Sequence, residues 1–152
     1  MPARAMLRRL WMPLVLATTA ACHDGPFSPF FDRGLYDLIS ANGEYVPSTV
    51  YSAVAAGHVQ RVDVQGGTLT LHSDGSYNLL VHARESTDGV VVDVTHAYAG
   101  AYDAEDTILY LSYDVPGSNY GAEMQAVWRD GTIEVVVPDV AMGHGVLMRF
   151  AR

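Results

Sequence analysis

The chain has no lysine, a single cysteine, and no apolar run long enough to span a membrane as a helix. Its nine basic residues are all arginines, and 17 acidic residues outnumber them. Arg4, Arg8 and Arg9 precede the cysteine and no acidic residue does, so the remainder is even more acidic than the net charge of −8 suggests. Nucleic acids and anionic lipid headgroups are bound by clustered positive charge. The scarcity of such charge argues against both kinds of partner.

Sequence patterns for metal binding and nucleophilic catalysis are also missing. The chain lacks a cysteine pair, a His-x-x-x-His or Glu-x-x-His pattern, and a Gly-x-Ser-x-Gly elbow. Three histidines on expected strands are interpreted as surface residues: His72, His82 and His96. The segment from Asp103 to Asp106, which includes Glu105, lacks the spacing of an EF-hand and is interpreted as a solvated acidic turn. We therefore expect a protein that is not an enzyme and that holds no metal or cofactor.

The N-terminal segment has the three parts of a secretory signal peptide. The early arginines form a basic start, residues 10–17 form a short apolar run interrupted by Pro13, and small residues from Thr18 to Ala21 lead to Cys22. The apolar run is well short of the roughly 20 residues that cross a bilayer. We therefore predict that residues 1–21 are removed after export.

The residues Thr19-Ala20-Ala21-Cys22 resemble the lipobox of bacterial lipoproteins. The resemblance implies that the Cys22 thiol receives diacylglycerol, and that cleavage then makes Cys22 the N-terminus. Further acylation, with a chain such as palmitate, follows in this family, and more than one acyl chain is needed for a stable membrane anchor. His23 stands where inner-membrane lipoproteins often carry Asp, so the resemblance implies the outer membrane of a bacterial cell envelope.

The rest of the chain is expected to form a linker and one domain. Residues 22–33 contain Gly25, Pro26 and Pro29, which is typical of a tether between a lipid anchor and a folded unit. Residues 34–152 are enough for one hydrophobic core but too few for two.

Alternation of apolar and polar residues from Gly34 onward predicts strands rather than helices. Tight hairpin turns are expected at Asn42-Gly43, Asp74-Gly75 and Asp130-Gly131, with type I′ geometry at the second. Gly100 is expected to mark a kink or bulge in a long strand, and only residues 50–64 are ambiguous between strand and short helix. The side chains expected inside include Leu69, Leu71, Leu79, Val81, Val146, Met148 and Phe150.

About eight or nine short strands joined by tight turns favour an all-β, antiparallel meander barrel, with a two-sheet sandwich as the alternative. The segments Gly34-Leu35-Tyr36-Asp37-Leu38 and Gly67-Thr68-Leu69-Thr70-Leu71, the turn at Asp74-Gly75 and the ending Met148-Arg149-Phe150 resemble bacterial lipocalin-like lipoprotein domains. The resemblance implies a small barrel with an apolar cavity.

Two functions follow as hypotheses. Aromatic residues inside a barrel either line a ligand pocket or simply fill the core, and the candidates for pocket lining are Tyr77, Tyr98, Tyr102, Tyr110 and Trp128. Large apolar side chains leave little void in a narrow barrel, which favours a non-catalytic envelope interaction or scaffold module, anchored to the membrane and contacting an envelope protein. The alternative is a carrier of a small hydrophobic ligand. Residues 90–102 and 110–113 hold more apolar side chains than one strand face can bury, which predicts a pocket or an exposed contact patch there.

Overall fold

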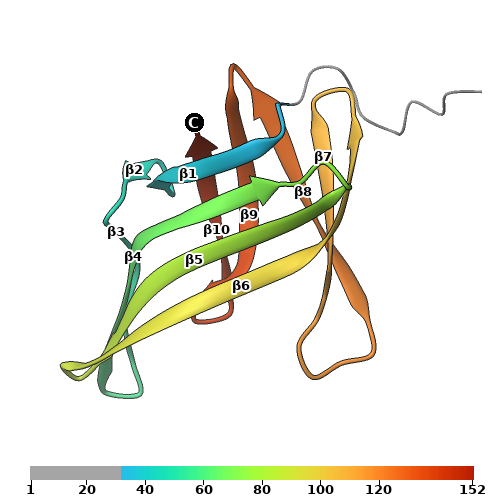
Figure 1. The fold of residues 1–152 in the computed structure, drawn as a ribbon. Helices are drawn as coiled ribbons and strands as arrows, with labels where there is room; N and C mark the ends of the chain where they lie inside the picture. The colour runs from blue at the N-terminus through green and yellow to red at the C-terminus, as the bar shows by residue number, and fades with distance from the viewer. Residues whose placement is uncertain (1–31) are drawn as a thin grey trace, which may run out of the picture.

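The computed structural model describes residues 32–152, which form a β-barrel without helices (Figure 1). The predicted signal peptide, the lipobox and Cys22 lie outside the described residues. Within the described part of the chain, no helix is long and apolar enough to cross a membrane. The ten strands are β1 Gly34–Ala41, β2 Glu44–Tyr45, β3 Ser48–Ala55, β4 His58–Leu71, β5 Ser76–Thr87, β6 Val90–Glu105, β7 Ile108–Asp114, β8 Gly121–Arg129, β9 Thr132–Ala141 and β10 His144–Ala151.

Eight of these strands close into the barrel. Strands β4 to β10 are antiparallel neighbours in chain order, and β1 closes the ring between β10 and β4. In this closure Leu38 lies opposite Phe150, and Tyr36 lies opposite Leu69. The predicted all-β meander barrel is therefore confirmed over the sandwich, and its architecture is compatible with a lipocalin-like fold.

The barrel interior is made of side chains that alternate along each strand with exposed ones. All the side chains expected inside are buried, and Leu79, Val81 and Phe150 have no accessible surface. On β5 the buried residues alternate strictly with exposed ones from Tyr77 to Ala83. Because neighbouring side chains of a strand point to opposite faces, this alternation directs one face of every barrel strand into a common core.

Most hairpin turns use residues in the left-handed region of backbone conformation. Five turns place a non-glycine residue and then a glycine there: Asn42-Gly43, Ala56-Gly57, Asp88-Gly89, Asp130-Gly131 and Met142-Gly143. The type I′ geometry expected at Asp74-Gly75 is wrong, because only Gly75 has a positive φ, of 84°. There the Gly75 N–H donates to the His72 carbonyl at 3.3 Å, and Gly75 supplies the left-handed residue of a longer, bulged turn.

Two other expectations about strand limits are corrected. The acidic turn expected from Asp103 to Asp106 is mostly strand, because β6 continues to Glu105 and the chain turns at Asp106 and Thr107. The ambiguous residues 50–64 form most of β3 and the first half of β4. Strands β4 and β6 have 14 and 16 residues, longer than expected, because each continues beyond the closed part of the barrel.

Strands β6 and β7 stay paired only near the turn that joins them. Tyr102–Glu105 pairs with Ile108–Leu111, and beyond this the two strands diverge (Figure 1). At the divergence point a Cβ atom on Gly100 would overlap the carbonyl oxygen of Ser112. The kink or bulge expected at Gly100 is thus a close backbone approach that only glycine permits.

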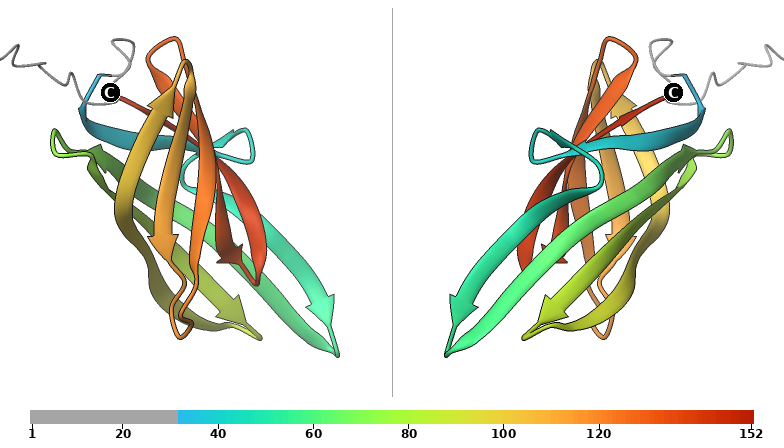
Figure 2. Two further views of the ribbon diagram at one scale, coloured as in Figure 1. Left: turned by 90° about the vertical axis from the view of Figure 1, so that its right-hand side faces the viewer. Right: turned by 90° about the vertical axis from the view of Figure 1, so that its left-hand side faces the viewer.

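The divergence leaves an open sheet at one end of the barrel. This flared sheet consists of β3, residues 58–64 of β4, residues 83–87 of β5 and residues 90–97 of β6. Its hairpin tips project beyond the closed barrel (Figure 2). β3 and β6 are its two edges, since the strand pairs formed by the described residues give neither of these stretches a second neighbour.

Candidate functional site

The five aromatic residues expected to line a pocket do not gather in one place. Tyr77 and Tyr102 are buried in the core, where the Tyr102 hydroxyl donates to the His72 carbonyl at 2.9 Å. Trp128 is partly buried against the core, and Tyr110 lies on the other face of β7 from the buried Leu109 and Leu111. Tyr98 alone of the five lines one of the grooves described below.

A groove of about 420 Å³ lies where β6 and β7 diverge. We call it the β6–β7 groove, and its lining residues are Thr95, His96, Ala97, Tyr98, Tyr113, Val115, Pro116 and Asp139. His96 lies opposite Val81 and Tyr98 lies opposite Leu79, so both project from the face of β6 that continues the barrel interior. The groove therefore forms at the side of the barrel where the wall is left open.

Two tyrosine rings of this groove contact each other. The rings of Tyr98 and Tyr113 meet edge to face, with centroids 5.3 Å apart and an angle of 88° between their planes. The Tyr98 hydroxyl donates to the Pro138 carbonyl at 2.5 Å, which holds its ring in place. Burial, followed by the Asp139 carboxylate and by Tyr113, raises the pKa of Tyr98 to about 12, so its hydroxyl is neutral at physiological pH.

Two buried polar atoms near the groove have no hydrogen-bond partner among residues 32–152: the Tyr77 hydroxyl and His96 Nε2. Burial raises the pKa of Tyr77, and Tyr113 and Tyr98 raise it further. A buried polar group that lacks a partner costs about 1–3 kcal/mol. This part of the barrel therefore keeps hydrogen-bonding capacity that its own side chains do not use.

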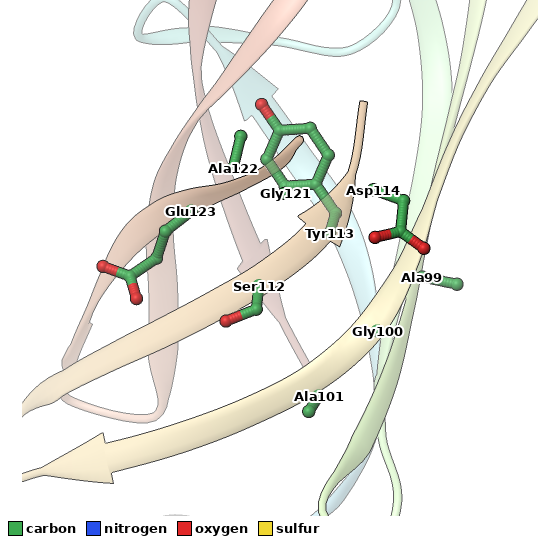
Figure 3. Close-up of a pocket in the computed structure, with 9 residues that line it drawn as sticks. All are labelled: Ala99, Gly100, Ala101, Ser112, Tyr113, Asp114, Gly121, Ala122 and Glu123. Carbon is green, nitrogen blue, oxygen red and sulfur yellow. The ribbon is translucent and has the colours of Figure 1, made fainter. Parts of the chain in front are cut away.

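A second groove, of about 450 Å³, lies on the outer face of the same divergence (Figure 3). Small residues form most of its lining: Ala99, Gly100, Ala101, Ser112, Gly121 and Ala122. The carboxylates of Asp114 and Glu123 lie toward its two sides, and Tyr113 lines both grooves. The described residues contain no group of three or more His, Cys, Asp or Glu side chains placed to hold a metal ion.

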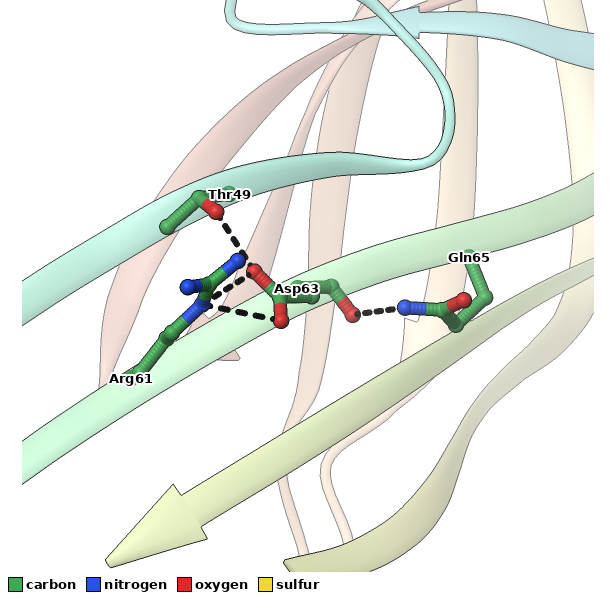
Figure 4. A network of polar contacts seen from close by, with 4 residues as sticks. All are labelled: Thr49, Arg61, Asp63 and Gln65. Carbon is green, nitrogen blue, oxygen red and sulfur yellow. Dashed lines mark hydrogen bonds and ion pairs between the residues drawn. The ribbon is translucent and has the colours of Figure 1, made fainter. Parts of the chain in front are cut away.

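A polar network crosses the outer face of the flared sheet (Figure 4). Asp63 accepts hydrogen bonds from the Thr49 hydroxyl at 2.6 Å and from Arg61 Nε at 2.8 and 2.9 Å. Burial acts to raise the pKa of Asp63, but the hydrogen bonds from Arg61 and Thr49 outweigh it and hold that pKa below its ordinary value. The charges of Arg61 and Asp63 neutralise each other, and the hydrogen bond from Thr49 to Asp63 joins β3 to β4. We therefore interpret the network as support for the β3–β4 pairing.

The end of the flared sheet carries exposed valines that we call the valine tip: Val54, Val59, Val90, Val91 and Val92. Val54 and Val59 lie opposite one another in the β3–β4 hairpin. The β5–β6 turn is tied to this hairpin by Asp88, which contacts His58 Nδ1 at 2.5 Å and accepts the Val59 N–H at 2.9 Å. The apolar excess expected in residues 90–102 is thus partly exposed, at this tip.

Comparison of the chain with protein-family models, with curated proteins and with solved structures found no match in any of the three. Its function is therefore inferred from its own residues.

Several groove residues were not expected from the sequence. His96 was interpreted as a surface residue but is half-buried on the inner face of β6, whereas His82 is exposed as expected. The alternation of the strand could have indicated this position. His96, Tyr98 and Tyr102 are separated by even numbers of residues, so their side chains point to the same face of β6. The position of Asp139 could not be inferred from alternation. It follows a proline in β9, and its left-handed φ of 58° interrupts the regular strand conformation.

Proposed function

We propose that the protein is a bacterial lipoprotein, anchored in the outer membrane through Cys22, whose barrel is a non-catalytic interaction module that contacts another envelope protein. The small residues before Cys22 support the anchor. The packing of the barrel and the position of the valine tip support the interaction role.

The packed interior is the observation that carries this proposal. Leu69, Leu109, Ile133 and Met148 come from four different strands, and none has accessible surface. A side chain without accessible surface has no water-sized void beside it. Because pockets for small apolar molecules occupy about 300 Å³ or more, such packing favours contact with a partner over carriage of a hydrophobic ligand.

The valine tip is the surface best suited to that contact. Clustered exposed apolar side chains mark interaction sites on soluble domains. The described chain begins at the end of the barrel opposite the tip (Figure 1). An anchor attached upstream of Asp32 therefore leaves the tip directed away from its point of attachment, toward a protein partner.

Site-specific photocrosslinking in living cells tests the contact. A photoreactive residue at Val91 should give one discrete protein adduct, while the same residue at Val136 should give none. The two positions are a matched pair, because their exposed fractions are 55% and 54% and Val136 lies on the barrel wall. Identical adducts at both positions, or none at Val91, would exclude the valine tip as the contact surface.

The anchor is tested separately. Cys22→Ser should move the protein from the membrane fraction to the soluble fraction, and mass spectrometry of the native protein should find an acylated N-terminal Cys22. An unmodified Cys22, together with a Cys22→Ser protein that fractionates like the native one, would remove the anchor from the proposal.

A further inference from the structure

Among residues 32–152, the lining of the β6–β7 groove contains a single charged residue, Asp139, and no arginine. The whole chain carries a net charge of −8. The groove is therefore suited to a positively charged ligand and disfavours an anion, because an anion would lie beside an uncompensated carboxylate.

The aromatic part of the groove has the same preference. The face of a tyrosine ring is negative and attracts cations, most strongly where water is partly excluded. Tyr98 is held by its bond to Pro138 and Tyr113 packs edge to face against it, so the pair is ordered before any ligand arrives. An ordered site loses less entropy on binding.

The groove lining offers one exposed charged acceptor to a donor on the ligand, the Asp139 carboxylate. The Tyr98 hydroxyl already donates to the Pro138 carbonyl, and His96 Nε2 is buried, so the N–H groups of a ligand are left to the carboxylate. A carboxylate accepts more than one hydrogen bond. A protonated amine carries several N–H donors, unlike a quaternary cation.

We propose that the β6–β7 groove binds a small organic ammonium ion, with its charge against the Asp139 carboxylate and the faces of Tyr98 and Tyr113, and with an N–H donated to that carboxylate. This site is separate from the valine tip, and neither proposal depends on the other.

An NMR titration of the isotope-labelled, full-length protein in detergent tests this site, with n-butylammonium as the probe and n-butanol as its neutral counterpart. Butylammonium should bind with a dissociation constant on the order of millimolar, about fivefold more tightly than butanol. The largest shifts should appear at His96, Tyr98 and Tyr113. Equal binding of the two probes, or shifts centred away from these residues, would overturn the proposal.

Charge variants separate a local contact from the general acidity of the chain. Asp139→Asn should weaken butylammonium binding about fivefold, the size of an exposed ion pair. Asparagine suits the left-handed conformation of residue 139, so the fold should be kept. The matched control is Asp114→Asn, which removes the same charge from the outer groove and should change binding by less than about twofold. Equal weakening by both variants would contradict the proposed site.

A tyrosine variant tests the role of the ring. Tyr98→Phe keeps the aromatic face and removes the hydroxyl, whose bond to Pro138 helps to order the ring but which does not contact the ligand, so butylammonium affinity should fall by no more than about twofold. Tyr98→Leu should weaken binding by about fivefold. If the phenylalanine variant lost binding to the same extent as the leucine variant, the ring faces would not be the contact.

Discussion

The two ends of the β5–β6 hairpin carry similar apolar residues in opposite surroundings. At the barrel end, Tyr77, Leu79 and Val81 of β5 are at most 1% exposed, whereas at the tip Val90 and Val92 of β6, which point to the same face, are more than half exposed. Both ends are extended and both have partners across the hairpin. The difference is that the ring of strands closes over the first end and not over the second, so closure rather than hydrophobicity decides burial.

Hydrogen exchange should show the largest contrast between these two ends. Amides of β5 in the barrel, such as that of Leu79, should exchange only through global unfolding, which corresponds to about 5 kcal/mol or more of protection. Alternate amides of residues 90–99, which point away from β5, should exchange near the unprotected rate because no described strand accepts them. Uniform protection along β6 would mean that the divergence from β7 does not persist in solution.

Adding one methyl group at the divergence point should be the most damaging single substitution. Gly100→Ala places its Cβ against the Ser112 backbone, and the overlap should lower the free energy of unfolding by about 3 kcal/mol in urea denaturation. Gly66→Ala is the control, because a Cβ there meets nothing within 4 Å and the residue lies in the irregular part of β4. Equal effects of the two changes would argue against a close approach at Gly100.

The same truncation at the two ends of the hairpin should give unequal losses. Val81→Ala removes two buried methyl groups and should cost about 2 kcal/mol of unfolding free energy. Val92→Ala acts on a side chain of the same face that is 54% exposed, and it should cost less than about 0.5 kcal/mol. A comparable loss at Val92 would show that the valine tip is covered in the folded protein.

A loss smaller than that of Val81→Ala is expected at the groove between the two regions. Tyr98→Phe removes the hydrogen bond to Pro138 and should cost about 1 kcal/mol at neutral pH. Unfolded Tyr98 releases its proton near pH 10, whereas the folded residue holds it until a pKa of about 12, so this stabilisation is complete below pH 10 and is lost as the pH rises toward 12. Urea midpoints from pH 9 to 12 should therefore fall less steeply for Tyr98→Phe than for the native protein. Parallel curves would contradict the raised pKa.

Local signals were sufficient for most of the strands and for several turns. The inward faces of β4, β5 and β10 follow from period-two alternation, and the turns at Asn42-Gly43 and Asp130-Gly131 follow from residues that accept left-handed conformations. The turn at Ala56-Gly57 was missed because alanine rarely adopts a positive φ, and its value of 51° is maintained by the pairing of β3 with β4 on either side.

The candidate site was less predictable than the strands. Tyr98 was among the expected pocket residues, but Tyr77 and Tyr102 have the same parity on their strands and are buried in the core instead. Tyr98 differs from them because β7 does not pair with the part of β6 that contains it. The sequence of β6 alone does not indicate where β7 separates from it.

The sequence by itself therefore determined that this chain forms strands, which faces of them are apolar, and where most of them reverse direction, because each of these properties depends on residues within a few positions of one another. Only the tertiary structure decided that β1 closes the barrel against β4, that β6 leaves β7 at Gly100, and that Asp139 of β9 lines the groove with Tyr98. These features depend on which strand pairs with the remaining free edge of each hairpin. That choice is made by packing between segments that lie far apart in the chain.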